Sequence, residues 1–439
     1  MQIPKCWRQM IYTDAIEVNP RVHLARGKSY SFLDMASVDP SARCALASES
    51  RLFNGGGSRF VPGDTLLARI TPCLENGKIA RYCGPGEEAH GSTEFIVIRG
   101  HDNVTDSGYA YYLTKWEGVR GYAISQMTGT SGRQRVPTES LSNLIVPVPP
   151  LPEQRRIAHI LGTLDDKIEN NRKTAKTLEA MAQAIFKSWF VDFDPVRAKM
   201  AGESRESICK RLKLTPEILD LFPDRLVDSE LGEIPDGWEV GMLDNLAALV
   251  TDSTSPGRSP HTVFEHYSIP AFDAGRTPAM ELGESIKSNK YVIKHSAVLV
   301  SKLNPHTPRI WLPANGDGAA ICSTEFMQFV PHEREDRPYL YCLMISQSMQ
   351  EEVLKHVTGS TGSRQRAQPS QIAKVKILSP QSCVKKVFTH QASPLLHAVA
   401  ENLTASRTLA ALRDALLPRL ISGEIRAADT HGCSKEILV

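Results

Sequence analysis

The sequence has no excess of charge of either sign. Its 439 residues include 51 Lys and Arg against 49 Asp and Glu, which leaves a formal net charge of +2 at pH 7. The overall composition therefore does not indicate a nucleic-acid-binding protein, since such proteins commonly carry a basic surplus. The hydrophobic content of 41% is that of an ordinary folded protein, and the length allows about two to four domains.

Long apolar runs and targeting patterns are also missing. No stretch approaches the roughly 20 apolar residues that a membrane-spanning helix needs. Residues 1–18 lack the basic, apolar and small-residue regions of a secretory signal. We therefore expect a cytoplasmic protein without membrane contact.

Closely spaced cysteines are absent. The nine cysteines are scattered along the chain, and no two of them form a Cys-x-x-Cys pair. This pattern predicts reduced thiols rather than a disulfide framework, and it predicts no metal site.

The familiar catalytic motifs are missing as well. The Gly-Lys-Ser run at 27–29 is similar to the end of a phosphate-binding loop, but Val22 stands where that loop needs a glycine. Asp64, Glu75 and Lys78 superficially resemble a nuclease set and are interpreted as surface charge. No Asn-Pro-Pro-aromatic tetrapeptide, Gly-x-Ser-x-Gly elbow or His-Glu-x-x-His motif occurs. We expect no catalytic residue and no cofactor bound by this chain.

What the sequence does contain is an internal repeat with an offset of about 231 residues. Ile-Pro at 3–4 and Trp7 recur at 234–235 and Trp238. Ser-Thr-Glu-Phe at 92–95 recurs at 323–326, and Arg-Gln-Arg at 133–135 recurs at 364–366. Because this period is far longer than that of a solenoid, each copy must hold a whole globular domain and the segment after it.

Each copy reads as a mixed α+β domain followed by a long helix. In the first copy, β-rich runs at 64–70 and 94–99 alternate with Gly and Pro, and residues 109–125 read as one helix. The Pro-rich run 146–152 cannot continue a sheet, so it marks the end of the domain and the start of a helix. The predicted organisation is: domain 1, 1–150; first helix, 151–190; acidic linker, 191–233; domain 2, 234–379; second helix, 380–425; C-terminal tail, 426–439.

A heptad pattern predicts that the two helices form a coiled coil. Apolar residues recur with steps of three and four from Ile157 to Trp189, and the same seam recurs from Phe388 to Leu420, with Arg413 as its weak point. Pro418 predicts a bend or fraying in the last turn. The residues expected to pair the helices are Leu164, Asn171, Leu178, Leu395, Asn402 and Leu409.

Asn171 and Asn402 occupy the same seam position in the two copies. If the helices pack on each other, these amides lie close together and fix the register, unless they are merely tolerated at an exposed position. We favour an antiparallel pair, because it would place the two domains at opposite ends and give the chain a pseudo-two-fold axis.

Two donor-rich segments in each copy could face DNA. The Gly- and Thr-rich loop 128–135 ends in Arg-Gln-Arg and recurs at 358–366, while segments 69–78 and 302–309 carry further donors. Arginine can bind phosphate or guanine in bidentate fashion, and glutamine can read adenine. For the Arg-Gln-Arg loop alone, a solvated turn packed near the helix start is an equal alternative. The candidate DNA-binding residues are Arg69, Asn76, Lys78, Arg133, Gln134, Arg135, Lys302, Asn304, Arg309, Arg364, Gln365 and Arg366.

The chain resembles the specificity subunit of type I restriction-modification systems over essentially its whole length. The resemblance rests on the Thr-Gly loop with Arg-Gln-Arg, the Pro-Pro-Leu-Pro-Glu-Gln run at 149–154, the Trp-Phe-Val-Asp-Phe run at 189–193, and the Ile-Pro-Asp-Gly-Trp start of the second copy. The second copy departs from it, having Ser-Pro-Gln-Ser-Cys at 379–383 in place of Leu-Pro-Glu-Gln. That departure makes it doubtful that both helix starts dock a partner in the same way.

The resemblance implies a non-catalytic subunit of a phage-defence complex. It implies two target-recognition domains that each read half of a bipartite double-stranded DNA site, held by antiparallel helices. It further implies two methyltransferase subunits that use S-adenosylmethionine, and restriction subunits that use ATP and Mg²⁺ for translocation and cleavage. None of these cofactors is expected on this chain.

Length and charge add two expectations. A helix of about 40 residues is about 60 Å long, the length of roughly 17 to 18 base pairs, so the rod could set the spacer between half-sites. Residues 1–150 hold 16 basic and 14 acidic side chains and residues 234–379 hold 14 and 15, so we expect the isolated chain to bind DNA weakly. The alternatives are a self-sufficient DNA methyltransferase or nuclease, and a tandem-domain scaffold that binds protein or glycan.

Overall fold

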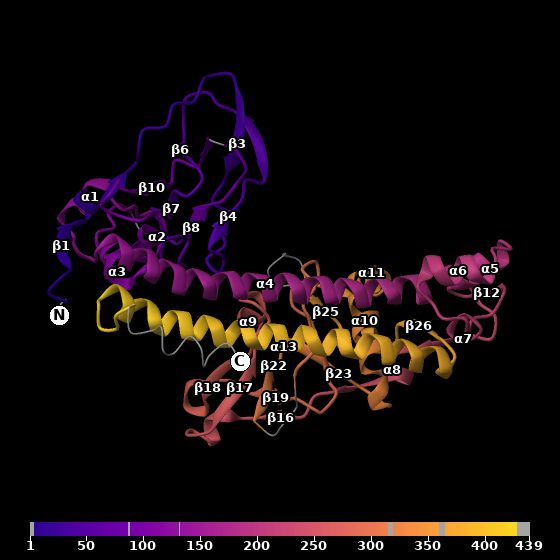
Figure 1. The fold of residues 1–439 in the computed structure, drawn as a ribbon. Coiled ribbons are helices and arrows are strands. Elements are labelled where there is room, and N and C mark those ends of the chain that lie inside the picture. Colours follow the sequence, from indigo (N-terminus) through magenta and orange to yellow (C-terminus); the bar gives the residue numbers. More distant parts are fainter. Residues whose placement is uncertain (1–3, 87, 131, 315–318, 360–364, 428–439) are drawn as a thin grey trace. The chain divides into compact units, whose positions relative to one another are not determined.

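The computed structural model describes residues 4–86, 88–130, 132–314, 319–359 and 365–427. The chain divides into two compact units: residues 1–170 with 406–439, and residues 171–405. The fold is α+β, with a mixed-sheet domain in each unit and two long helices (Figure 1). No helix within the described ranges is both long and apolar enough to cross a membrane.

The domain of the first unit, domain 1, contains two sheets and a strand pair. A five-stranded sheet has the order β2-β10-β7-β8-β4, a four-stranded sheet has the order β5-β3-β9-β6, and β1 pairs with β11. The bounds are β1 Arg8–Ile11, α1 Tyr12–Ala15, β2 Ile16–Val18, β3 Ser29–Leu33, β4 Cys44–Ala45, β5 Glu49–Leu52, β6 Ser58–Phe60, β7 Thr65–Ala68, β8 Ile79–Tyr82, β9 Ala89–Gly91, β10 Phe95–Gly100, α2 Ser107–Lys115, α3 Glu117–Ser125, η1 Thr138–Asn143 and β11 Ile145–Val148.

The domain of the second unit, domain 2, repeats most of this topology, without a counterpart of β4 and with β16 as an additional edge strand. Its sheets have the orders β15-β23-β20-β21 and β16-β19-β22-β17-β18, and β14 pairs with β26 as β1 pairs with β11. The bounds are β14 Glu239–Met242, α8 Leu243–Leu246, β15 Ala247–Val250, β16 Ser253–Thr254, η2 Pro256–Arg258, β17 Val263–Tyr267, α9 Ile269–Asp273, β18 Ala279–Leu282, η3 Gly283–Ser285, β19 Lys290–Val292, β20 Val298–Ser301, β21 Ile310–Trp311, β22 Ala320–Ser323, β23 Phe326–Pro331, η4 Arg334–Asp336, α10 Arg337–Ile345, α11 Gln347–Lys355, β24 Val357–Thr358, β25 Arg366–Ala367, α12 Pro369–Ile372 and β26 Lys376–Ser379.

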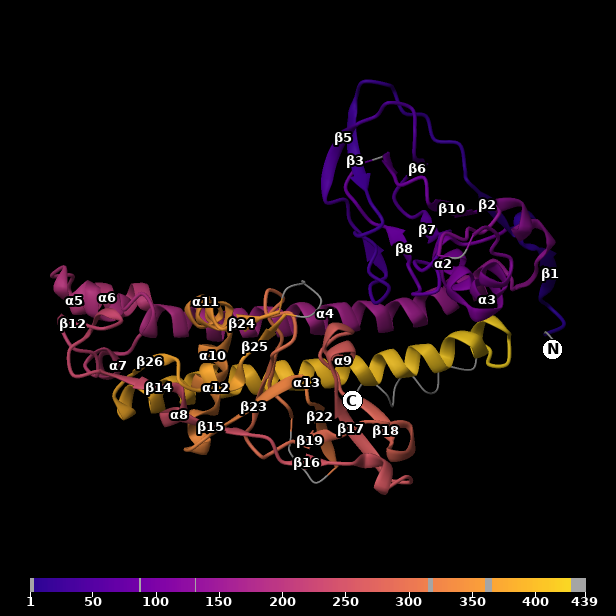
Figure 2. The same cartoon turned by 180° about the vertical axis from the view of Figure 1, so that it is seen from behind.

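The two predicted long helices are present as α4, Leu151–Phe190, and α13, Ser382–Ile421, of 40 residues each. In the first unit, Ile157 near the start of α4 shares a core with Leu420 near the end of α13. In the second unit, Phe186 near the end of α4 lies against Phe388 near the start of α13, with ring centroids 5.7 Å apart. The helices therefore pack against each other and run antiparallel (Figures 1 and 2).

Seam residues near both ends of these helices share cores, Ile157 with Leu420 in the first unit and Ala182 with Phe388 in the second. Pairing through Leu164, Leu178, Leu395 and Leu409 stays a prediction. Pro418 does not end the second helix. Asn171 is 4% exposed, and Asn402 donates through its amide nitrogen to the carbonyl oxygen of Ala398, 2.7 Å away in its own helix. The pairing of the two Asn residues stays a prediction. The expected fraying is wrong, because α13 continues to Ile421, and Ser422 N donates to Pro418 O at 3.0 Å.

Two local predictions in domain 1 are corrected by backbone detail. The helix expected at 109–125 is two helices, α2 and α3, because Trp116 has an extended ψ of 138° that interrupts the hydrogen bonding. The Pro-rich run does enter a sheet: Pro147 lies opposite Gln9 in the β1–β11 pair. A two-stranded pair has only edge strands, where the missing N–H of proline is tolerated.

The segment 191–233 is folded rather than a plain linker. It contains α5 Asp194–Met200, α6 Arg205–Leu212, α7 Pro216–Leu219 and β12 Leu226–Ser229, which pairs with β13 Gly232–Pro235. Its apolar residues, such as Ile208 and Phe222, are buried in one cluster with Trp189 and Trp238. Its acidic surplus masked the apolar spacing of these short helices.

The expectation of reduced thiols is wrong for one pair. Cys44 and Cys83 form a disulfide across adjacent chain segments, with Cα atoms 5.5 Å apart. The parallel pairing of β4 with β8 brings them together, although 39 positions separate them. Among the described cysteines, six are free: Cys6, Cys73, Cys209, Cys322, Cys342 and Cys383.

Candidate nucleic-acid interface

In domain 1 the two donor-rich segments lie side by side. The loop after β7 meets the loop after α3 through backbone hydrogen bonds: Thr71 N donates to Gln134 O at 3.0 Å, and Val136 N donates to Arg69 O at 2.9 Å. Residues 69–78 and 128–135 therefore form one surface, which we call the loop pair of domain 1.

Domain 2 repeats the same contacts. Asn304 N donates to Gln365 O at 3.0 Å, and Ala367 N donates to Lys302 O at 2.9 Å. The segment 302–309 and the described residues 358–359 and 365–366 thus form the loop pair of domain 2. The repeat alone does not predict this adjacency, and Arg364 lies outside the described residues.

A matched ion pair fixes each loop pair. Arg135 donates two hydrogen bonds to the Glu94 carboxylate, and Arg366 does the same with Glu325. The closest N–O distances are 2.7 Å and 3.0 Å. Hydrogen bonding to the carboxylates raises the pKa of both guanidinium groups. The two most regular anchors of the repeat, Ser-Thr-Glu-Phe and Arg-Gln-Arg, are therefore joined to each other.

The remaining side chains of the loop pairs differ in their exposure to solvent. Arg133 is exposed, and Gln134, Lys302 and Gln365 are half-buried. Asn304 has a left-handed φ of 48°.

Two buried polar atoms of the loop pairs have no hydrogen-bond partner among the described residues: Nε of Arg69 in domain 1 and Oδ1 of Asn304 in domain 2. An unpaired buried polar atom costs about 1–3 kcal/mol. Ten such atoms occur among the described residues, in both units, so these two do not by themselves indicate a ligand.

Other predicted DNA-binding residues make contacts within the protein. Lys78 Nζ donates to Met35 O at 2.6 Å. Arg309 is paired in bidentate fashion with Asp273, at 2.6 and 2.9 Å, and its side chain is only 11% exposed. Asn76 is exposed.

The heptad position of Arg413, read from the sequence as a weak point, is a buried polar junction. Arg413 Nη1 donates to Asp165 at 2.7 Å, and Tyr112 OH donates to the other carboxylate oxygen at 2.6 Å. Burial raises the pKa of Tyr112, and the adjacent Asp165 carboxylate raises it further. The sequence signal for this contact was an acidic residue beside Leu164 on the facing helix.

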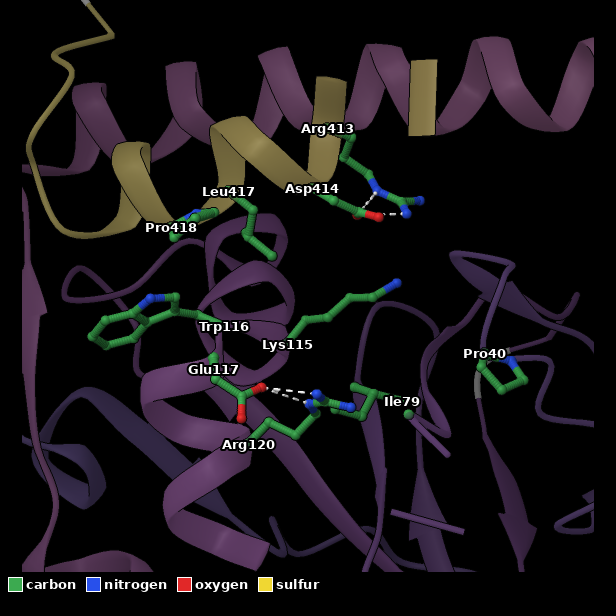
Figure 3. A pocket seen from close by; sticks show the side chains of 11 residues that line it. Pro40, Ile79, Lys115, Trp116, Glu117, Arg120, Arg413, Asp414, Leu417 and Pro418 are labelled. Carbon is green, nitrogen blue, oxygen red and sulfur yellow. Dashed lines mark hydrogen bonds and ion pairs between the residues drawn. The ribbon is translucent and has the colours of Figure 1, made fainter. Parts of the chain in front are cut away.

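Beside this junction lies a cavity of about 370 Å³, shown in Figure 3. Its cations Arg120 and Arg413 are paired with Glu117 and Asp414, and Lys115 Nζ donates to Tyr111 OH at 3.3 Å. Burial lowers the pKa of Lys115. The cavity lining contains no Ser, Cys or His, so it offers no nucleophile beside an imidazole base.

No cluster of metal-binding side chains occurs in the part of the chain that the structure describes. No group there of three or more His, Cys, Asp or Glu side chains could hold a metal ion. Neither loop pair has the donor set of a metal centre.

Comparisons with known proteins agree with a DNA-reading role. Residues 61–180 match the family model described as "Type I restriction modification DNA specificity domain". The chain is 26% identical to the HindI specificity subunit of Haemophilus influenzae over 87% of this chain and 91% of that protein. It is 26% identical to the MjaIX specificity subunit of Methanocaldococcus jannaschii over 74% of this chain and 70% of that protein.

One solved structure supports the fold. The S subunit of a type I restriction-modification system from M. genitalium aligns with a TM-score of 0.51 and 13% identity, covering 95% of this chain and 96% of that one. At this identity the alignment speaks for the architecture of paired domains and long helices.

Proposed function

The chain belongs to the DNA specificity subunits of type I restriction-modification systems, and from this premise we propose that each of its two domains reads one half of a bipartite DNA site. The subunit is not itself catalytic. The observation that carries the proposal is the repetition of the loop pair: the same backbone contacts and the same Arg–Glu ion pair occur in both domains. A protein that contacted DNA through one domain alone would not need the same loop pair in both domains.

The proposal assigns different tasks to the residues of each loop pair. Arg135 and Arg366 hold the loops through their glutamates, while Gln134 and Gln365 are placed to contact base edges, where Gln can bind adenine through two hydrogen bonds. Arg133 supplies a free cation for guanine or phosphate.

The long helices, in the same proposal, serve assembly. We assign to α4 and α13 the docking of two methyltransferase subunits that carry S-adenosylmethionine, and of restriction subunits that use ATP and Mg²⁺. Support comes from the packing of the helices, since a paired and largely buried seam leaves their outer faces to other subunits. The helix length would then set the spacer between the half-sites.

The test is a pair of single substitutions read by genomic methylation mapping. We expect Gln134→Ala to relax or lose recognition at one half-site only, and Gln365→Ala to affect only the other half-site. Each lost bidentate contact should reduce discrimination by about 1–3 kcal/mol, roughly 10- to 100-fold. The matched controls are Gln126→Ala and Gln368→Ala, which lie outside the loop pairs and should leave the motif unchanged.

Two outcomes decide the proposal. A change confined to one half-site for each variant supports independent reading by two domains. Loss of methylation at the whole motif by either variant, with the protein folded and the complex assembled, would contradict it, since the loop would then act in assembly.

A further inference from the structure

A basic surface on the four-stranded sheet of domain 1 lies outside both loop pairs. Residues 21–30 and 51–60 together hold five Arg or Lys and no Asp or Glu. We call these five residues the basic patch: Arg21, Arg26, Lys28, Arg51 and Arg59. All are exposed except Arg59, which is half-buried. Their charge is balanced by carboxylates elsewhere in the domain, so the domain total does not reveal them.

The two segments that carry the patch are joined by the backbone. Gly27 N donates to Phe53 O at 3.0 Å, and Phe53 N donates to Lys28 O at 2.8 Å. Figures 1 and 2 show the strands β3, β5 and β6, which support these segments, at the end of the domain away from α4. The patch is therefore one continuous surface on an end of the domain that α4 does not cover.

Two of its guanidinium groups converge on a glycine. Arg59 Nη2 donates to Gly55 O at 3.3 Å. A Cβ atom on Gly55 would lie only 2.9 Å from Arg26 Nη2, and Gly55 has a φ of +102°. The positive φ favours glycine at this position, and a side chain there would displace the Arg26 guanidinium group.

Aromatic rings hold other patch cations in place. Arg51 lies over the Phe32 ring at 3.8 Å, and Arg59 lies over the Phe53 ring at 4.9 Å. Within the described chain, Glu49 is the one carboxylate in an ion pair with a patch residue, Arg51, and both side chains are about half exposed. The cations are therefore positioned in advance but little neutralised, which reduces the ordering cost of binding an anion.

The equivalent strand pair of domain 2 is acidic rather than basic. The pair β17–β18 corresponds in topology to β3–β5, yet it contains no Arg or Lys and carries Glu265 and Glu281. The neighbouring loops carry the exposed cations Arg258 and Lys287. The fold therefore does not require a basic residue at the position of Arg51.

We propose that the basic patch binds the sugar–phosphate backbone of the DNA that the loop pair of domain 1 reads, as a sequence-independent contact. This inference rests on the proposed function. The ligand class follows from exposed, preorganised guanidinium groups beside glycines that allow close backbone approach. A domain of nearly neutral charge can bind DNA in this way because five of its cations are concentrated on two joined segments.

The test measures how DNA affinity depends on salt. The full chain, assembled in its type I complex, is titrated with two fluorescent duplexes, one with its methylation motif and one scrambled, at several NaCl concentrations. The patch variant is Arg26→Gln with Lys28→Gln. The matched control is Arg258→Gln with Lys287→Gln, which removes two exposed charges from domain 2.

We expect the patch variant to lower the slope of log K against log salt by about 2, because each phosphate contact contributes about 0.9. The loss should be equal for both duplexes, and the control should match the wild type. A patch variant with the wild-type slope would overturn the inference. The inference would also be overturned if the patch variant lost a partner subunit from the complex while the salt slope of DNA binding stayed unchanged. The patch would then be a contact with protein.

A pair of glycine variants tests the geometry without changing charge. Gly55→Ala should displace Arg26 and weaken binding of the scrambled duplex, whereas Gly86→Ala should not, because Gly86 has the same φ of +102° and a Cβ there meets nothing within 4 Å. Thermal melting establishes that both variants are folded. Equal binding by two folded variants would contradict the assigned role of Arg26.

These results also separate this inference from the proposed function. If the wild-type complex shows no preference for the motif duplex, the proposed function fails. If the preference is present and the slope does not move, only the role of the patch fails.

Discussion

At the scale of single residues, the main finding is that the third member of each Arg-Gln-Arg motif is used inside the protein. The repeat showed that Glu94, Arg135 and their counterparts Glu325 and Arg366 matter, but an offset cannot show that two motifs 41 positions apart touch. Side-chain chemistry suggested DNA for both arginines, because a guanidinium group binds phosphate and carboxylate alike.

This ion pair gives a first prediction. Glu94→Gln should release Arg135 and loosen the loop pair of domain 1, so that methylation loses selectivity at one half-site. Because the pair is largely solvent-exposed, the melting temperature should hardly change. Glu94→Asp, which keeps the charge, should restore part of the selectivity. A fall in melting temperature with full selectivity would show instead that the pair serves folding.

A second residue-scale prediction concerns His90, which is 5% exposed in the four-stranded sheet. Burial lowers its pKa, and the nearby charge of Arg51 lowers it further, although the Arg51 carbonyl oxygen 3.3 Å away acts in the opposite direction. The unfolded chain takes up a proton near pH 6.5, and the folded chain does so only at lower pH. The contribution of His90 is therefore fully present above about pH 7 and is lost as the pH falls below about 6.5.

We expect the melting temperature of the wild type to fall more between pH 7 and pH 5 than that of His90→Phe, which keeps the aromatic contacts with Phe32 and Phe53. Both proteins contain the same carboxylates, so the effect of carboxylate titration on the melting temperature cancels in the comparison. Equal pH dependence of the two proteins would show that His90 is protonated in the folded state.

At the scale of secondary-structure elements, the long helices were predictable from their periodic pattern. A helix break, short helices and a disulfide were not. The heptad seam predicted α4 and α13 and their packing on each other, since many residues carry that signal. Their antiparallel orientation was expected from the symmetry of the repeat and not from the seam. The break at Trp116 depends on one backbone angle, and the folded segment 191–233 uses short helices whose apolar spacing covers few turns. The Cys44–Cys83 bond depends on strand pairing between distant residues.

The helix junction in the first unit gives a third prediction. Asp165 and Arg413 are 5% and 11% exposed and form an ion pair at 2.7 Å. Asp165→Asn removes one partner of a buried pair and should lower the free energy of unfolding by about 3–5 kcal/mol, as measured by urea denaturation.

Asp166→Asn is the matched control. This neighbouring carboxylate is 62% exposed and is paired with Arg43, so its loss should cost about 1 kcal/mol or less. If the two variants were equally stable, the polar junction between α4 and α13 would not contribute to the packing of the helices.

At the scale of the whole molecule, the chain is a tandem repeat of one unit, which consists of a mixed α+β domain and a long helix. This could be derived from the sequence, because separated motifs share one offset and the sheets then share most of their topology. The net charge of +2 hid an uneven distribution: the loop pairs and the basic patch carry exposed cations, while carboxylates elsewhere balance them. Averages over a domain cannot show which face a charge occupies.

The central claim is that this chain determines which DNA sequence its type I complex recognises. The most direct measurement is genomic methylation mapping in cells with and without the chain, with the partner genes active in both. The account predicts one split, adenine-methylated motif that disappears when the chain is deleted and returns when it is restored. An unchanged methylation pattern after deletion would contradict it.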